Sequence, residues 1–419
     1  MRKIKKVFTL LLIATTVICF LVTGTKLSTA TEIHCSLLGK DCQTLSVVQQ
    51  PQNLSAAIAS TVKQQLKVSP RVVFFGSSTT VGVGSTRGDR RWSTLLSRYL
   101  GWQEINQGLS GSKITNFYKN LPSDSPWRVP PAVERSHQDV LRYEPDLVVM
   151  MYGTNDIYRQ VPLGAASQNQ PGTFYTDLKT LLTDLKSALP PERLIVSTPQ
   201  PSIKTQDSRT PYDLALEAGA GQVGAIFIDT GHEAFPASDL PQYAADGLHP
   251  NNLGHAAIAS FMAAKMVDLG LVAPPPTAVG GNQLSEKLVP LKGGKLRIDL
   301  DNPLTFGEIR TIEAEWVASG KAALAIFRPN GRGGYEIVYR TSSFAVNPGR
   351  DRIKIPRWWV LDGDRLAVWT QGDCLGSEAT SQGTAHHLYS AVESDADIND
   401  VTQEFLSPDS YRLAIWTGK

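Results

Sequence analysis

Residues 72–82 read Val-Val-Phe-Phe-Gly-Ser-Ser-Thr-Thr-Val-Gly, an apolar run that ends in a glycine and a cluster of hydroxyl side chains. Four β-prone residues in a row are typical of a strand that is covered on both faces, as in a parallel sheet. Gly76 allows the chain to turn sharply where that strand ends. Ser77 or Ser78 is then a candidate nucleophile, although serines are also common in ordinary strand-to-helix turns because they cap helices.

The strand-then-helix pattern that begins at this stretch continues to about residue 270. Short apolar runs predict strands, and apolar residues that recur every three to four positions predict helices. Five strands that alternate with helices predict an α/β fold with a flavodoxin-like, doubly wound, five-stranded parallel sheet and right-handed crossovers. The expected strands are 72–75, 102–105, 146–152, 194–197 and 224–228, and the expected helices are 92–100, 131–141, 174–189, 211–222 and 252–269.

The pattern changes after the prolines of 273–277. Residues 296–301 and 352–355 alternate between apolar and polar side chains, which is typical of half-buried strands. Turn signals such as Asn330-Gly331 and Asp362-Gly363 separate several runs of this kind. We therefore expect a Pro/Gly-rich linker at 273–283 and a C-terminal all-β sandwich domain at 284–419, of the jelly-roll or immunoglobulin-like kind.

The first 30 residues have the composition of an export signal, with a basic start, an apolar run over 7–22 and small residues at 28–30. This predicts a secreted or extracytoplasmic protein. The alternative is an uncleaved membrane anchor, because 7–24 approaches the length that spans a bilayer, and only then would the protein contact a membrane. Residues 31–69 are expected to form a leader or linker with a short helix at 53–67.

Length and composition limit the remaining possibilities. A chain of 419 residues is too long for one ordinary core, so we expect two domains. Its 41 basic and 39 acidic residues nearly cancel, which gives no indication of a nucleic-acid partner. In an oxidising compartment Cys35 and Cys42 are suited to a disulfide, which would leave Cys374 unpaired. The cysteines do not have metal-site spacing.

Chemically active side chains follow the predicted strands. Loops that leave the carboxyl ends of parallel strands meet at one crevice, so residues far apart in sequence come together there. These loops hold Ser78, Gly111, Asn155 and the pair Asp246 and His249. Each motif alone is weak, because turns and caps explain it equally well, but together and in this order they predict one site.

In these motifs the chain resembles the SGNH hydrolase superfamily, the GDSL-type esterases and lipases, over about residues 70–272. The family's first block is Gly-Asp-Ser with a glycine four residues on, and its alignment here selects Ser78 over Ser77. Ser77 stands where the family usually has Asp, which puts the local loop structure and the substrate class in doubt. The four blocks are Gly76-Ser77-Ser78 with Gly82, Asn106-x-Gly108-x-x-Gly111, Gly153-x-Asn155-Asp156, and Asp246-x-x-His249.

The resemblance implies a serine hydrolase that needs no metal or organic cofactor. Ser78 is the expected nucleophile, His249 its base, and Asp246 the acid that orients the imidazole and stabilises its charged form. The expected oxyanion hole consists of the backbone N–H groups of Ser78 and Gly111 and the side-chain amide of Asn155. Losing one such donor typically costs about 2.7 to 4 kcal/mol of transition-state stabilisation.

The function expected from these residues is a secreted ester hydrolase that acts through an acyl-enzyme on a small ester or an acylated polysaccharide, and the activity we expect is that of a carbohydrate O-acetylesterase. One alternative is a lipase or phospholipase, which the polar loops at 83–91 and 123–129 disfavour. Another is a non-catalytic surface protein that binds glycans on a hydrolase scaffold, which the complete triad disfavours.

Tryptophans of the C-terminal part suggest glycan binding there, because aromatic faces stack on sugar rings. The alternative explanation is that these tryptophans fill the hydrophobic core of the domain. Adjacent residues on a strand face opposite ways, so one of Trp358 and Trp359 is expected to be exposed if the other is buried. The tryptophans in question are Trp316, Trp358, Trp359, Trp369 and Trp416.

The other histidines have structural interpretations. His255 is expected on the last helix of the α/β part, and His232 follows a strand. His386 and His387 are adjacent, so on a strand they would face opposite ways and are poorly placed to share a metal.

Overall fold

The computed structural model describes residues 69–417 apart from 119–121, 123, 126–127, 236, 245, 282–287, 292, 332–333, 380–386, 392–404, 408–410 and 414. The predicted signal segment, the helix at 53–67, Cys35, Cys42 and His386 lie outside the described residues. No helix within the described part is long and apolar enough to cross a membrane.

A five-stranded parallel sheet forms the first half of the described chain. Its strands are β1 (Arg71–Gly76), β2 (Gln103–Gly108), β3 (Leu147–Met151), β4 (Leu194–Ser197) and β5 (Ile226–Ile228), and they lie in the order β2-β1-β3-β4-β5. This is the flavodoxin-like order, so the predicted doubly wound sheet is confirmed. The strand order reverses next to β1, and ligands bind at such a switch point.

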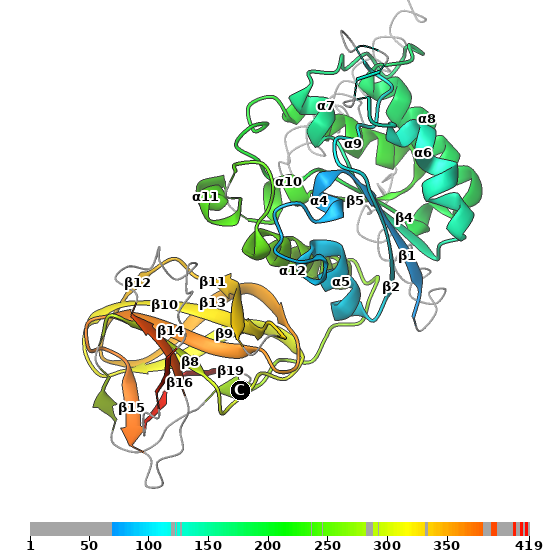
Figure 1. Cartoon of the computed structure of the whole chain (residues 1–419). Helices are drawn as coiled ribbons and strands as arrows, with labels where there is room; N and C mark the ends of the chain where they lie inside the picture. Colours follow the sequence, from blue (N-terminus) through cyan, green and yellow to red (C-terminus); the bar gives the residue numbers. More distant parts are fainter. Residues whose placement is uncertain are drawn as a thin grey trace, which may run out of the picture. The chain divides into compact units, whose positions relative to one another are not determined.

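Helices cover both faces of this sheet (Figure 1). Val72 and Phe74 of β1 share a core with α5 (Trp92–Leu100) and α12 (Asn252–Asp268), whereas Val73 and Phe75 share another with α6, α8 and α9. The alternation arises because successive strand residues point to opposite faces. The remaining helices are α4 (Ser78–Val81), η1 (Gly88–Arg90), α6 (Ala132–Asp139), η2 (Leu141–Tyr143), α7 (Thr154–Tyr158), α8 (Phe174–Ala188), η3 (Pro191–Arg193), α9 (Thr210–Val223), α10 (Thr230–Glu233), η4 (Ala237–Asp239) and α11 (Leu240–Tyr243).

Several predicted boundaries differ from the structure. The second strand was expected at 102–105 but runs from Gln103 to Gly108. It is an edge strand with polar residues and no fully buried position, so its apolar signal is short.

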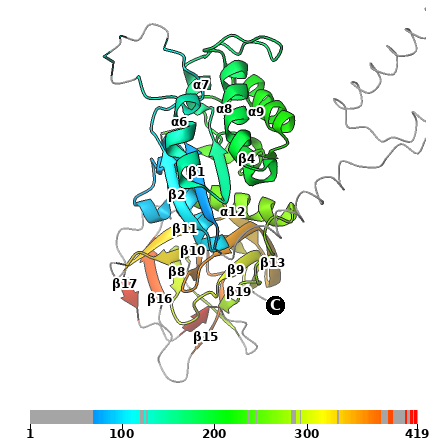
Figure 2. The same ribbon diagram turned by 90° about the vertical axis from the view of Figure 1, so that its right-hand side faces the viewer.

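The C-terminal part consists of antiparallel strands (Figure 2). One sheet has the order β11-β10-β14-β8-β16-β17 with β12 beside β10, a second has β13-β9-β19-β6, and a third has β18-β15-β7. The predicted all-β character is confirmed, while its assignment as a sandwich stays a prediction. The strands are β6 (Gly280–Gly281), β7 (Val289–Pro290), β8 (Lys295–Asp299), β9 (Gly307–Trp316), β10 (Gly320–Pro329), β11 (Tyr335–Arg340), β12 (Phe344–Val346), β13 (Gly349–Val360), β14 (Arg365–Gln371), β15 (Gly376–Ala379), β16 (His387–Ala391), β17 (Phe405–Ser407), β18 (Tyr411–Leu413) and β19 (Ile415–Thr417).

The expectation that Trp358 or Trp359 is exposed is wrong. Both are buried, as are Trp316 and Trp369. Each has an aromatic neighbour: Trp358 stacks on Tyr339 with 5.2 Å between ring centroids, and the ring of Trp359 lies 5.8 Å from that of Tyr99 of α5. The strict alternation at 296–301 also fails to give a solvent face, because Arg297 and Asp299 are buried.

Tyr339 on β11 joins the antiparallel part to the helices of the parallel sheet. Its hydroxyl lies 2.9 Å from that of Tyr99, and hydrogen-bonds with Ser260 Oγ on α12 at 2.5 Å. It also donates to the carbonyl of Trp359. One hydrophobic core continues from Phe74 to Ile415, and the described residues all belong to one compact unit. The predicted boundaries at 70–272 and 284–419 stay a prediction.

Candidate active site

Ser78 begins the short helix α4 directly after β1. Two glycines allow this close turn: a side chain at Gly76 would overlap Thr80, and one at Gly108 of β2 would overlap the backbone of Val81. Ser77 and Ser78 are both largely buried, at 4% and 9% exposure. Of the two hydroxyls, that of Ser78 contacts the histidine.

His249 and Asp246 lie in the loop between α11 and α12. His249 Nε2 is 3.1 Å from Ser78 Oγ, and Nδ1 is 2.7 Å from Asp246 Oδ2. Because a carboxylate only accepts, Nδ1 carries the hydrogen and Nε2 accepts from the serine. The structure thus brings the three predicted triad residues into one hydrogen-bonded chain.

Asp246 is held in its charged form. Partial burial opposes ionisation, but hydrogen bonds from the backbone N–H and ring of His249 and from the backbone N–H of Leu248 lower the pKa of Asp246 to about 2. A carboxylate with such a pKa stays negative at any pH at which an imidazole can act as a base. It is therefore able to stabilise a positive charge on His249.

The other two predicted donors line the same pocket as Ser78. Gly111 follows β2 with φ of 79°, a left-handed conformation that favours glycine. Asn155 lies on α7, and its Nδ2 donates to the carbonyl of Ser112 at 2.9 Å. An amide nitrogen has two hydrogens, so this bond fixes the side chain while the second hydrogen can serve a ligand.

Asp156 connects these two donor loops, a role that sequence reasoning missed. Its carboxylate is fully buried and accepts hydrogen bonds from the backbone N–H groups of Ile114 and Thr115, at 2.9 and 3.2 Å. Burial raises the pKa of Asp156 to about 6, against the effect of those bonds. Its position after Asn155 in the third block was the available signal. Asp156, which follows Asn155 on α7, therefore holds the segment after Gly111 in place.

The pocket has a volume of about 720 Å³. Its walls are mixed: Val83, Phe117 and Leu248 are apolar, whereas Ser110 and Gln160 are polar. Val129 and Pro162 add to the apolar part of the lining, so the pocket presents both apolar and polar surface to a ligand.

His255 supports the pocket from behind, as expected for a structural residue. It is fully buried on α12; Nδ1 accepts from the backbone N–H of Trp92, and Nε2 donates to the carbonyl of Val83 in the pocket wall. Burial lowers the pKa of His255 to about 4, so it stays neutral and keeps both bonds at neutral pH.

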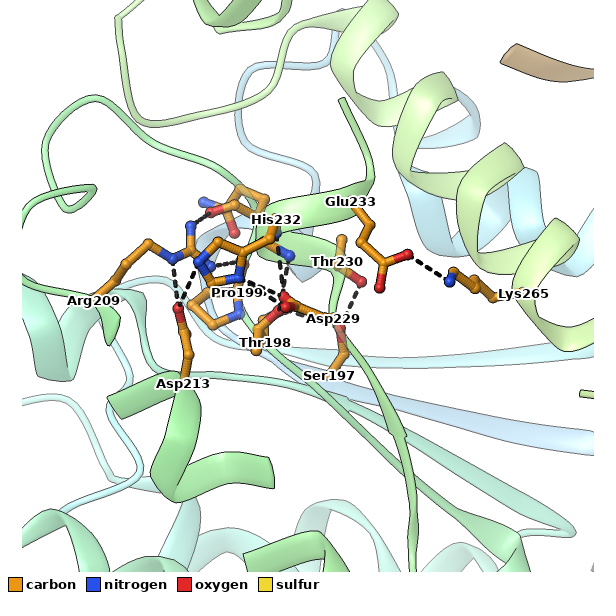
Figure 3. Close-up of polar contacts among 12 residues, drawn as sticks. Ser197, Thr198, Pro199, Arg209, Asp213, Asp229, Thr230, His232, Glu233 and Lys265 are labelled. Carbon is orange, nitrogen blue, oxygen red and sulfur yellow. Dashed lines mark hydrogen bonds and ion pairs between the residues drawn. The ribbon is translucent and has the colours of Figure 1, made fainter. Parts of the chain in front are cut away.

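His232 has the same Asp-x-x-His spacing as His249 but a different environment. Its Nδ1 lies 2.8 Å from Asp229 Oδ2, and its Nε2 faces Asp213 at 3.9 Å (Figure 3). Arg209 pairs with that second carboxylate at 2.6 Å. Within the described part of the chain, the contacts of the His232 ring are to these two carboxylates and not to a serine hydroxyl, and they connect the segment after β5 to α9. The described residues contain no group of three or more side chains suited to a metal ion.

Comparisons with known proteins show what the α/β part of the chain is similar to. A model of the GDSL-like lipase/acylhydrolase family matches residues 74–257. No curated protein matches the chain.

Solved structures with a similar fold include three esterases. A lipase/acylhydrolase from Enterococcus faecalis is 20% identical with a TM-score of 0.37, and the alignment covers 49% of this chain and 97% of that one. An aryl esterase from M. smegmatis is 21% identical with a TM-score of 0.37, and the alignment covers 48% of this chain and 100% of that one. A carbohydrate acetylesterase from Sinorhizobium meliloti is 17% identical with a TM-score of 0.36, and the alignment covers 48% of this chain and 99% of that one.

Proposed function

We propose that this chain is a secreted serine esterase that removes short acyl groups, with acetylated carbohydrate as its substrate class, because residues 74–257 match the model of the GDSL-like lipase/acylhydrolase family, whose enzymes hydrolyse esters. The observation that carries the serine mechanism is the 3.1 Å contact between His249 Nε2 and Ser78 Oγ, with Asp246 on the other ring nitrogen.

In the proposed reaction Ser78 Oγ attacks the ester carbonyl carbon while its proton moves to His249 Nε2. The N–H groups of Ser78 and Gly111 and the amide of Asn155 stabilise the negative oxygen of the tetrahedral intermediate. The alcohol leaves with the proton from His249. Water then attacks the acyl-serine, gives a proton to His249, and the acid is released as Ser78 regains that proton.

The preference for short acyl groups rests on the pocket. A lipase needs an apolar groove for its acyl chain, whereas the lining here includes polar and cationic side chains such as Ser110, Gln160 and Lys113. Glycan binding by the C-terminal part loses most of its expected basis, because four of the five tryptophans, Trp316, Trp358, Trp359 and Trp369, are buried, and the side chain of Trp416 lies outside the described part of the chain. We propose that this part instead supports α12, the helix that follows the His249 loop.

The test compares two adjacent serines. Ser78→Ala should lower kcat for p-nitrophenyl acetate by about 10⁴-fold or more, whereas Ser77→Ala, the matched control, should stay within about tenfold of wild type. A fluorophosphonate should label the peptide that contains Ser78. An active, unlabelled Ser78→Ala variant would overturn the mechanism.

A second comparison tests the substrate class. The enzyme should hydrolyse p-nitrophenyl acetate with a higher kcat/KM than the palmitate ester, and should release acetate from acetylated polysaccharide. A preference for palmitate would instead establish the lipase alternative.

A further inference from the structure

Three cationic side chains from three different segments line the pocket beside Ser78. Lys113 follows β2, Arg159 follows α7, and Lys204 lies in the segment between β4 and α9. Among the described residues that line this pocket, none is Asp or Glu. A concave site with charges of one sign concentrates ligands of the opposite sign.

Lys113 is the most deeply placed of the three. It is only 5% exposed, and its ammonium lies 4.3 Å from the centroid of the Tyr118 ring. Within the described part of the chain it forms no side-chain hydrogen bond and no ion pair. An ammonium has three hydrogens to donate, and one that is largely removed from water gains from an acceptor in the pocket that it lines.

The charges around Lys113 do not remove this requirement. Asp156 and Glu134 attract it electrostatically, but Asp156 already accepts from two backbone N–H groups and Glu134 accepts from the side-chain amide of Asn116, while Arg159 and Arg128 repel it. Burial, followed by these repulsions, lowers the pKa of Lys113. An anion bound in the pocket would supply the missing acceptors and favour the charged lysine.

We propose, on the basis of the proposed esterase function, that this pocket selects esters that carry a carboxylate, which Lys113 binds with the support of Arg159 and Lys204. Lys113 is two residues from Gly111, a span of at most about 7 Å. The carboxylate therefore lies close to the scissile ester. For a carbohydrate this chemistry corresponds to an acylated sugar acid.

The test uses neutral and anionic substrates of the same shape. For a carboxylate on the alcohol, 4-acetoxybenzoate is compared with 4-acetoxybenzamide; for one on the acyl group, mono-4-nitrophenyl glutarate is compared with 4-nitrophenyl valerate. Wild type should prefer the anionic member of one pair by about 10- to 100-fold in kcat/KM, the range of a charge-assisted hydrogen bond. The favoured pair identifies the side of the ester that carries the charge. No preference in either pair overturns the proposal.

Variants then assign the preference to Lys113. Lys113→Met should reduce the anionic-to-neutral ratio to about one, and Lys113→Arg should restore part of it. Lys179→Met, an exposed lysine on α8 outside the pocket, should keep the wild-type ratio. A ratio unchanged in Lys113→Met overturns the assignment, because a merely structural lysine would lower both rates together.

Failure of this inference differs from failure of the esterase proposal. If the enzyme hydrolyses the neutral esters through Ser78 without a charge preference, only the inference is wrong. If no ester is hydrolysed, the esterase proposal is wrong as well. Competitive inhibition of wild type by benzoate but not by benzamide gives a readout that needs no variant, and equal inhibition by the two would count against the proposal.

Discussion

Asp246 uses its two carboxylate oxygens for different tasks. Oδ2 lies 2.7 Å from Nδ1 of His249, while Oδ1 accepts from the backbone N–H of the same residue at 2.7 Å and from that of Leu248 at 2.9 Å. One side chain therefore fixes both the loop that carries the imidazole and the orientation of the ring.

Replacing Asp246 by Asn should separate these tasks. The amide oxygen can still accept from the backbone, but the NH₂ group cannot accept from Nδ1, so the ring loses its correct tautomer. We expect kcat for p-nitrophenyl acetate to fall by about 10⁴-fold, with the melting temperature within a few degrees of wild type. Steady-state kinetics and thermal unfolding of the same preparation check this. Nearly full activity in a folded Asn variant would contradict the assigned role.

Asp156→Asn should lower activity without touching the triad. One of the two backbone N–H groups, of Ile114 or Thr115, would face the NH₂ of the new side chain instead of an acceptor. A buried donor left unpaired costs about 1 to 3 kcal/mol, and displacement of the Gly111 segment weakens the oxyanion hole. We expect kcat to fall by about 10- to 100-fold with a smaller change in KM. Asp146→Asn is a suitable control, because that buried carboxylate accepts from the backbone N–H of Arg71 at the start of β1, the end opposite to Ser78; equal losses of kcat in both variants would count against a specific role for Asp156.

The convergence of the loops that carry Ser78, Gly111, Asn155 and His249 was predictable from the sequence, because parallel strands place the loops that follow them at the same edge of the sheet. Once Phe74, Val149 and Ile195 were recognised as buried strand residues, the loops that follow had to converge at one edge of the sheet. The charge of the pocket was not predictable in this way, because Lys113, Arg159 and Lys204 come from loops whose paths depend on tertiary contacts.

The burial of both Trp358 and Trp359 was missed for a related reason. Strand alternation gives the two faces of a strand, but whether a second layer covers the outer face depends on where α5 and α12 lie.

Tyr339→Phe tests whether the antiparallel part stabilises the catalytic part. The change removes hydrogen bonds to Tyr99, Ser260 and the carbonyl of Trp359 in a buried place. We expect a loss of about 1 to 3 kcal/mol in the free energy of unfolding. Tyr175→Phe on α8, which is only half-buried, should change it by less than about 0.5 kcal/mol.

Urea unfolding followed by tryptophan fluorescence and by esterase activity in the same samples provides the measurement. Because one core continues through both parts, the two transitions should coincide and shift together in Tyr339→Phe. Activity that disappears at a lower urea concentration than the fluorescence change would show that the two parts unfold independently.

His255 should make the protein less stable in acid. The pKa of His255 is about 4 in the folded protein because of burial, against about 6.5 for an unperturbed histidine. Between these values the unfolded chain binds more protons, so the contribution of His255 to stability is complete above pH 6.5 and is lost as the pH falls towards 4. A shift of this size corresponds to about 3 kcal/mol.

The titration of Asp156 changes the free energy of unfolding in the opposite direction over nearly the same pH range. Its pKa is raised by burial to about 6, so its protonation favours the folded state as the pH falls from 6 towards 4. The pH dependence of wild type alone therefore understates the effect of His255, and the informative quantity is the difference between wild type and His255→Gln, in which Asp156 cancels. Gln can keep the contacts to Trp92 and Val83 without titrating. We expect wild type to exceed the variant in free energy of unfolding at pH 7 and to lose most of that advantage by pH 4.5. A difference that stays constant over this range would show that His255 is protonated with the same affinity in both states and is not held neutral by the fold.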